Sequence, residues 1–254
     1  MMSKKHIKVS AAFVLLILFA FRQPVKKIRI YLIGDSTIAI KQTTAYPETG
    51  WGMPFVNFFD KDVQIENRAQ NGRSTKTFVA ENRWQPVVDS LHTGDYVFIQ
   101  FGHNDEVPTK ASYTPINDYR NYLIKFVSET RSKGENPVLI TPVSRRKFDA
   151  LGKALDTHIE YAAMVRTVAS EQKVPLIDLD QKSIALLQKL GVEDSKMLFN
   201  QLQPGEHPNY PEGKIDDTHF NELGAREMAQ LVLKEIRTLN LDLVNHIVKP
   251  VVKK

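Results

Sequence analysis

The sequence predicts an α/β protein whose parallel sheet is covered by helices on both faces. Short apolar runs, rich in β-branched and aromatic residues, alternate along the chain with longer stretches of helical patterning. Such runs are typical of parallel strands that are buried on both sides. With 254 residues, of which 42% are hydrophobic and 25% charged, the chain can form a sizeable core and does not have the composition of a disordered protein.

Five strands are expected, and each is a short apolar run that lies between turn signals or helical stretches. The run YVFIQF at 96–101 is the clearest, whereas the run at 63–65 is the weakest. The first run ends at Gly34. In chain order, the expected strands cover 28–33, 63–65, 96–101, 138–140 and 174–177.

Helical patterning fills most intervals between the strands and the region that follows the last one. The last expected helix carries an apolar stripe at helical spacing, which indicates a side that faces the core. The longest expected loop covers 191–215, where prolines and glycines are frequent, and long loops in compact domains are often functional. The expected helices cover about 75–91, 116–133, 158–172 and 219–238.

The first 23 residues are typical of an export signal. Three lysines precede an apolar run from Ala11 to Phe21, and these 11 residues are fewer than the ~20 that span a bilayer. We therefore expect a signal peptide at 1–23 and a secreted or periplasmic protein without stable membrane insertion after cleavage. The cleavage site is poorly marked, which leaves an uncleaved anchor open. Residues 24–254 are expected to form a single domain with a C-terminal tail from about residue 239.

The net charge of +5 is concentrated at the two ends of the chain. Residues 1–23 carry +4 and residues 249–254 carry +3, which leaves −2 for residues 24–248. A basic face for a nucleic-acid backbone is therefore not expected. The chain has no cysteine, which excludes a disulfide scaffold, a thiolate zinc site and a cysteine nucleophile.

Polar clusters follow three of the expected strands, at the sheet edge where ligands bind in open α/β folds. A fourth cluster is expected to open the last helix. The clusters are Gly34-Asp35-Ser36-Thr37, Asn71-Gly72-Arg73-Ser74, Gly102-His103-Asn104-Asp105 and Asp216-Asp217-Thr218-His219. Taken singly, each is an ordinary turn or helix cap. Together they supply the groups that acyl transfer needs.

Ser36 is the candidate nucleophile, because a serine hydroxyl becomes reactive when an adjacent base takes its proton. His219 is the candidate base, and Asp216 lies three residues earlier, where it can hold the imidazole and stabilise its cation. The candidate oxyanion donors are the backbone N–H groups of Ser36 and Gly72 and the side-chain amide of Asn104. A preorganised donor of this kind contributes about 3–4 kcal/mol.

Other catalytic patterns fit less well. Ile38 stands where a nucleophile elbow needs its second glycine, which disfavours a conventional α/β-hydrolase. The sequence contains neither a phosphate-binding loop nor a dinucleotide fingerprint. A metal set can be drawn from Asp216, Asp217, His219 and His207, but no recognisable ligand motif supports it. No metal and no other cofactor are therefore expected.

The four clusters stand in the order of the four sequence blocks of the SGNH, or GDSL-type, hydrolases, and the chain resembles this family over about residues 28–238. The resemblance implies catalytic or oxyanion roles for Ser36, Gly72, Asn104 and His219, with Asp216 as the third member of the triad. It also implies a flavodoxin-like three-layer αβα sandwich with a central parallel five-stranded sheet.

Within that family, the chain resembles the rhamnogalacturonan acetylesterase branch. Thr37 occupies the position of the family leucine after the serine, and three further segments fit the branch: 71–75, 94–97 and 141–146. This resemblance implies hydrolysis of O-acetyl esters on pectic rhamnogalacturonan without a metal.

The expected partner is an acetylated polysaccharide or oligosaccharide. Because rhamnogalacturonan carries a uronic acid in each repeat, cations are expected in the cleft, and arginine binds carboxylates bidentately. Trp51 and Trp84 are expected to pack in the core rather than against a sugar. The candidate substrate-binding residues are Arg73, Arg145, Arg146 and Tyr210.

Two alternatives stay open at this point. A lipid, lysophospholipid or xylan acetyl esterase could use the same fold. A non-catalytic carbohydrate-binding protein could also have kept the fold, but every proposed catalytic position holds a residue of the required type, which argues against it.

Overall fold

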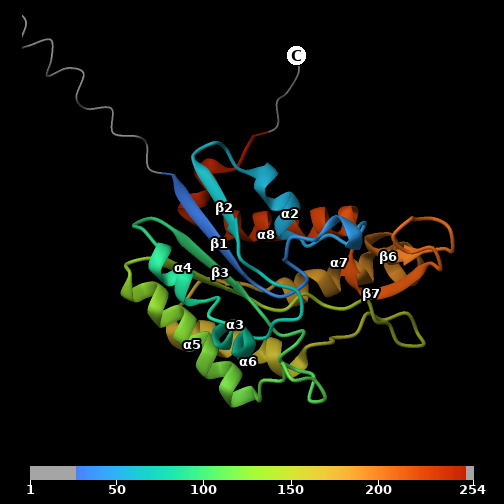
Figure 1. Cartoon of the computed structure of the whole chain (residues 1–254), viewed down its shortest axis with the longest axis horizontal. Coiled ribbons are helices and arrows are strands. Elements are labelled where there is room, and N and C mark those ends of the chain that lie inside the picture. The colour runs from blue at the N-terminus through green and yellow to red at the C-terminus, as the bar shows by residue number, and fades with distance from the viewer. Residues whose placement is uncertain (1–26, 250–254) are drawn as a thin grey trace, which may run out of the picture.

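The computed structural model describes residues 27–249, and a five-stranded parallel sheet lies between two layers of helices (Figure 1). The strand order is β2-β1-β3-β4-β5, and every neighbouring pair is parallel. The strands are β1 (Ile28–Gly34), β2 (Val63–Asn67), β3 (Tyr96–Gln100), β4 (Asn136–Ile140) and β5 (Leu176–Ile177). The predicted three-layer α/β fold and its five strands are therefore confirmed.

The predicted signal peptide at 1–23 lies outside the described residues, as do residues 250–254 of the predicted tail. Between residues 27 and 249, no helix is both long and apolar enough to cross a membrane. The described part of the tail packs against the sheet layer, where the 3-10 helix η4 (Asp242–His246) buries Leu243.

Alternate side chains of β1 pack against different helix layers, because successive side chains of a strand point to opposite faces. Ile30 and Leu32 face one layer, and Tyr31 and Ile33 face the other. The first layer contains α2 (Gly52–Phe55), α7 (Leu179–Asp194) and α8 (Glu222–Thr238). The second contains α3 (Thr75–Ala80), α4 (Gln85–Ser90), α5 (Ile116–Ser132) and α6 (Ile159–Gln172).

Both tryptophans lie in these cores, as expected. Trp51 meets Phe55 edge-on with 5.3 Å between ring centroids, and Trp84 meets Phe126 at 4.9 Å. Edge-to-face contacts of this kind are favourable beyond the area that they bury. Neither indole face is available to a sugar.

The predicted helix at 75–91 is broken into α3 and α4. Asn82 lies between them with a φ of +54°, and Pro86 stands in the first turn of α4. Proline has no N–H to donate, and its ring clashes with the preceding turn of a continuous helix. The first turn is the one helical position where proline is tolerated, so a new helix begins there.

The predicted loop at 191–215 is largely structured, which corrects the expectation. It contains the end of α7, a helix that the sequence patterning did not indicate, and an antiparallel strand pair. The elements that follow α7 are η3 (Ser195–Leu198), β6 (Phe199–Leu202) and β7 (Lys214–Phe220). Only 203–213 remains as a loop, and it holds all of the prolines and every glycine of this region except Gly191, which lies within α7. A strand as short as β6 depends on its partner for stability and leaves little local signal.

The Asp216–His219 cluster lies within β7, so the prediction that it opens the last helix is wrong. The cluster does not cap the last helix either, because α8 begins at Glu222 and its N-cap residue is Asn221. The candidate base and its carboxylate are therefore held by an extended strand and not by a helix terminus.

Asn221 is the residue that caps α8. Its side-chain oxygen accepts the N–H of Gly224 at 3.0 Å. Its amide nitrogen donates to the carbonyls of Met197 and Phe199 at 2.8 and 3.0 Å. One side chain thus joins the start of α8 to η3 and β6, two residues after His219.

We predict that Asn221→Ala lowers the free energy of unfolding by about 1–2 kcal/mol, because the helix loses its cap and two carbonyls lose a donor. Asn221→Asp keeps the accepting oxygen, but its second carboxylate oxygen faces the carbonyls of Met197 and Phe199 without a proton to donate, so this variant should also be less stable than wild type. Urea unfolding followed by circular dichroism measures both values. An alanine variant that unfolds at the wild-type urea concentration would contradict this assignment.

Candidate active site

Ser36 sits on a tight turn that directly follows β1. The neighbouring Asp35 is fully buried, and its Oδ1 accepts the backbone N–H and the hydroxyl of Thr37 at 2.9 and 2.8 Å. Burial raises the pKa of Asp35, and the two bonds from Thr37 oppose this effect. The hydroxyl at position 37 therefore holds the turn that presents Ser36.

The same turn is attached to β3 through Gln100. The Gln100 side-chain nitrogen donates to the Thr37 hydroxyl at 2.9 Å, and the Trp51 indole donates to the side-chain oxygen Oε1 of Gln100 at 2.9 Å. A Cβ atom at Gly34 would lie 2.4 Å from the backbone oxygen of Gln100. Only glycine lets the two strand ends approach this closely.

The structure brings together the three residues of the predicted triad. Ser36 Oγ lies 2.9 Å from His219 Nε2, and His219 Nδ1 lies 2.9 Å from Asp216 Oδ2. The other carboxylate oxygen of Asp216 accepts the backbone N–H groups of Thr218 and His219 at 2.8 and 2.9 Å. In this geometry the imidazole can take the serine proton while the carboxylate fixes its orientation.

Asp216 is ionised over the whole neutral range. Burial would raise the pKa of its carboxyl, but the hydrogen bonds from the His219 side chain and backbone outweigh burial and lower that pKa strongly. The carboxylate is thus available to stabilise a positive imidazole.

The two other predicted oxyanion residues come from different segments, and a hydrogen bond joins those segments. Gly72 has a φ of +75°, and nothing lies within 4 Å of the Cβ that another residue would place there. The side-chain amide of Asn104 donates to the backbone oxygen of Arg73 at 3.1 Å, which joins the end of β3 to the Gly72 turn. Asp105 strengthens this junction, because its Oδ1 accepts the N–H and hydroxyl of Thr75 at 2.9 and 2.6 Å.

Three charged residues beside the triad escaped the sequence analysis. Lys41 Nζ lies 2.7 Å from Glu48 Oε1, and Lys214 Nζ lies 3.2 Å from Glu48 Oε2 and 3.4 Å from Asp216 Oδ2. Burial would raise the pKa of Glu48, but the hydrogen bond from Lys41 and the neighbouring positive charges outweigh it and lower that pKa. Lysine is rarely buried without a charged partner, and the partners of Lys41 are not evident from the sequence. The buried position of Lys41 is therefore recognisable only in the fold.

A metal fits this donor set poorly. Glu48, Asp216 and His219 offer ligand atoms within 4.8 Å of one another. The two carboxylates already pair with Lys41 and Lys214, however, and a bound cation would lie beside two ammonium groups. The chemistry of these residues suits ion pairs inside the protein.

Arg145 and Arg146 connect the segment after β4 to the strand that carries the triad acid and base. Arg145 donates to the Thr218 hydroxyl at 2.9 Å and pairs with Glu106 at 3.1 Å. Arg146 pairs with Asp217 at 2.8 Å, and its side chain is nearly buried. Arg145 keeps 29% of its side chain exposed beside β7, so a role for it in substrate binding stays a prediction.

The other two candidate substrate-binding residues also have partners within the protein. Arg73 pairs with Glu81 at 2.9 Å. The Tyr210 hydroxyl donates to the Ala45 carbonyl at 2.9 Å, and the Lys214 ammonium lies 4.7 Å from the centroid of the Tyr210 ring. Tyr210 therefore joins the 203–213 loop to the segment that precedes Glu48, and its contact with a substrate also stays a prediction.

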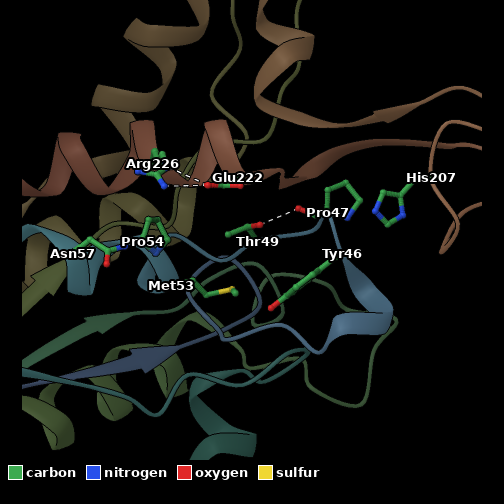
Figure 2. Close-up of a pocket in the computed structure, with 9 residues that line it drawn as sticks. All are labelled: Tyr46, Pro47, Thr49, Met53, Pro54, Asn57, His207, Glu222 and Arg226. Atoms are coloured by element: carbon green, nitrogen blue, oxygen red, sulfur yellow. Dashed lines mark hydrogen bonds and ion pairs between the residues drawn. The ribbon is translucent and has the colours of Figure 1, made fainter.

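A cavity of about 410 Å³ lies behind the segment that carries Glu48 (Figure 2). Pro47 and Thr49 line the cavity, whereas the Glu48 side chain between them is directed to Lys41 and Lys214. The wall includes an ion pair of α8, and no triad side chain belongs to the lining among the described residues. The lining residues are Tyr46, Pro47, Thr49, Met53, Pro54, Asn57, His207, Glu222 and Arg226.

Asp105 gives the site a predicted pH dependence. Burial raises the pKa of this carboxyl from an ordinary 3.8 to about 7. Because the folded state holds the proton more tightly than the unfolded state, the stabilising contribution is complete below about pH 4 and is lost as the pH rises through about 7. Asp105→Asn can still accept both bonds from Thr75 but does not titrate. We predict a flatter change of melting temperature between pH 4 and pH 8 in this variant, and equal profiles would contradict the assignment.

Comparison with known proteins agrees with this geometry. Residues 32–227 match the model of the GDSL-like lipase/acylhydrolase family. The rhamnogalacturonan acetylesterase RhgT of Bacillus subtilis is 42% identical over 223 residues, which cover 88% of this chain and 95% of that protein. The rhamnogalacturonan acetylesterase of Emericella nidulans is 45% identical over 228 residues, or 82% and 84% of the two chains.

The crystal structure of the Bacillus subtilis protein YxiM is also similar, with a TM-score of 0.74 and 26% identity. The match covers 87% of this chain but 59% of that longer one. The sequence blocks, the fold and these relatives lead to one conclusion. The chain belongs to the GDSL-like lipase/acylhydrolase family and is a serine esterase.

Proposed function

We propose that this esterase removes acetyl groups from pectic rhamnogalacturonan and that Ser36, His219 and Asp216 perform the reaction. The observation that carries the proposal is the continuous hydrogen-bonded arrangement of these three side chains. It is supported by 42% identity to an enzyme named for this activity, over 95% of that enzyme's length.

The reaction begins when Ser36 Oγ attacks the acetyl carbonyl carbon and His219 Nε2 takes the serine proton. The new negative charge on the carbonyl oxygen is stabilised by the N–H groups of Ser36 and Gly72 and by the Asn104 amide. The tetrahedral intermediate collapses to an acetyl-serine, and His219 returns the proton to the sugar oxygen that leaves. Water then attacks the acetyl-serine while His219 takes one of its protons. His219 passes that proton to Ser36 Oγ as the acyl–serine bond breaks, which restores the free serine and releases acetic acid, which ionises to acetate.

Arg145 is the best placed of the candidate residues to bind the uronic acid of the polysaccharide. Its guanidinium is bonded to Thr218, directly before His219, and it remains partly exposed. A carboxylate can share this guanidinium with Glu106 only if it approaches from the exposed side. Arg73 follows Gly72 in the proposed oxyanion turn and is the second candidate.

We also propose that the protein acts outside the cytoplasm. The support is the basic and then apolar sequence at 1–23, which is typical of an export signal. The N-terminal residue of the exported protein distinguishes cleavage near residue 23 from a retained anchor. Retention of the full chain in the cytoplasm would contradict the proposal.

The decisive experiment measures acetate release from acetylated rhamnogalacturonan, from acetylated xylan and from the same polymers after chemical deacetylation. We predict release from acetylated rhamnogalacturonan, none from the deacetylated polymers, and a loss of at least about 10³-fold in Ser36→Ala, in keeping with triad variants. Ser36→Ala should keep the wild-type melting temperature to within a few degrees.

Aryl esters provide the control for substrate class. A preference for acetate over butyrate and octanoate is the expected result, because the proposed leaving group is a sugar and the acyl group is small. A preference for the longer acyl chains would identify a lipid esterase instead, and faster release from xylan would move the substrate assignment to that polymer.

A further inference from the structure

Lys41 has a fully buried side chain immediately behind the nucleophile turn. Its ammonium group donates to the backbone oxygen of Ser36 at 2.5 Å, to Asn71 Oδ1 at 2.9 Å and to Glu48 Oε1 at 2.7 Å. An ammonium group has three N–H donors, and each of these three acceptors can take one. The contacts therefore use the full donor capacity of Lys41.

Two of these acceptors lie on the turns that carry the proposed oxyanion donors. One is the carbonyl of Ser36 itself, and the other is the side chain that precedes Gly72. The N–H groups of Ser36 and Gly72 are the proposed backbone donors to the oxyanion. A single nitrogen atom thus sets the separation of the two turns that carry these donors.

The third acceptor links Lys41 to the acid of the triad. Glu48 uses one carboxylate oxygen for Lys41 and the other for Lys214, and Lys214 lies 3.4 Å from Asp216. Charges alternate in sign along this path. The path joins the nucleophile turn to Asp216 without passing through the Ser36–His219 hydrogen bond.

Stability alone does not account for a lysine at this position. Burial lowers the pKa of Lys41, and Glu48 opposes that effect. A buried ion pair is commonly no more stabilising than apolar side chains of the same volume, because both charges lose their hydration. What Lys41 adds is a set of directional hydrogen bonds to the Ser36 and Gly72 turns. An apolar side chain could fill the same space but could not fix the position of one turn relative to the other.

We propose that Lys41 is a positioning residue, which holds the Ser36 and Gly72 turns at the separation that the transition state requires and connects them through Glu48 to Asp216. The proposal rests on the catalytic roles proposed above for Ser36 and Gly72, but not on the identity of the polysaccharide. Lys41 does not contact the substrate in this account.

Kinetics with 4-nitrophenyl acetate tests the proposal in Lys41→Met, which keeps a long unbranched side chain without the charge. We expect kcat and kcat/KM to fall together by roughly 10- to 100-fold, because small misplacements of reacting groups have effects of that size. A parallel fall is the pattern of an interaction that acts in the transition state. The melting temperature should also fall, because Glu48 loses a partner.

The double variant Lys41→Met with Glu48→Gln separates positioning from stability. In Lys41→Met alone, the Glu48 carboxylate has lost one of its two lysine partners, and the second substitution removes that charge. The melting temperature of the double variant should therefore be higher than that of Lys41→Met, while kcat stays low. Lys182→Met is the control for loss of a Lys–Glu pair away from the site: Lys182, whose side chain is 42% exposed, lies 3.1 Å from Glu235 in the interface of α7 and α8. It should lower the melting temperature without changing kcat.

A folded single or double variant with kcat within about twofold of wild type would overturn the proposal. So would a double variant in which kcat recovers together with the melting temperature. If Lys41→Met does not fold, the double variant decides alone. Wild-type turnover of the aryl acetate without acetate release from rhamnogalacturonan would refute the proposed substrate and leave this test intact.

Discussion

The register between β1 and β3 is the constraint from which the site is built. Gly34 pairs with Gln100, so the two neighbouring parallel strands end at the same level of the sheet. The residues that come next, Ser36 on one side and Asn104 on the other, therefore emerge at one edge. The absence of a Cβ at Gly34 permits the close approach, and the Gln100 side chain then holds Thr37 from the other strand. A slip of one residue would move the nucleophile turn away from its partners.

Asp216 and His219, the proposed acid and base of the triad, reach this edge by a different route. They lie on β7, outside the parallel sheet, and this strand is held by β6 and by two arginines from the segment after β4. The charges around it alternate, with Asp217 paired to Arg146 on one side and Asp216 beside Lys214 on the other. A strand with such pairing on both sides fixes the imidazole more firmly than a free loop would. This firmness suits a base that must accept and return a proton without changing its place.

The parts that follow from local patterning were predictable from the sequence. Four of the five strands are mainly apolar runs, β2 (VQIEN) alternates apolar and polar residues, and Ser36, Gly72 and Asn104 follow the ends of β1, β2 and β3 within five residues. The break in the helix at 75–91 was also readable from Pro86, but the helical pattern on both sides obscured it. Other features depend on contacts between distant segments. β6 is a strand because β7 pairs with it, and Asn221 is a cap because two carbonyls of the preceding segment accept its amide.

The role of Lys41 also depends on contacts between distant segments, because nothing in its sequence neighbourhood distinguishes it from a surface lysine. Its three partners are separated from it by 5 to 30 positions in the chain, and only the fold brings them to one nitrogen. The four proposed substrate-binding residues illustrate the opposite case. Their residue type and position were readable, yet the structure shows that each has a partner inside the protein. The type of a residue indicates which ligands its side chain can bind, whereas the fold determines which partners lie within its reach.

Activation of Ser36 as a nucleophile by His219 can be tested by covalent trapping. The protein is treated with an alkyl fluorophosphonate, and the modified peptide is located by mass spectrometry at several times of reaction. We expect a single adduct on Ser36, formed at least about 10²-fold more slowly in His219→Ala because the base is missing. An adduct on another residue, or equal rates of modification with and without His219, would contradict it.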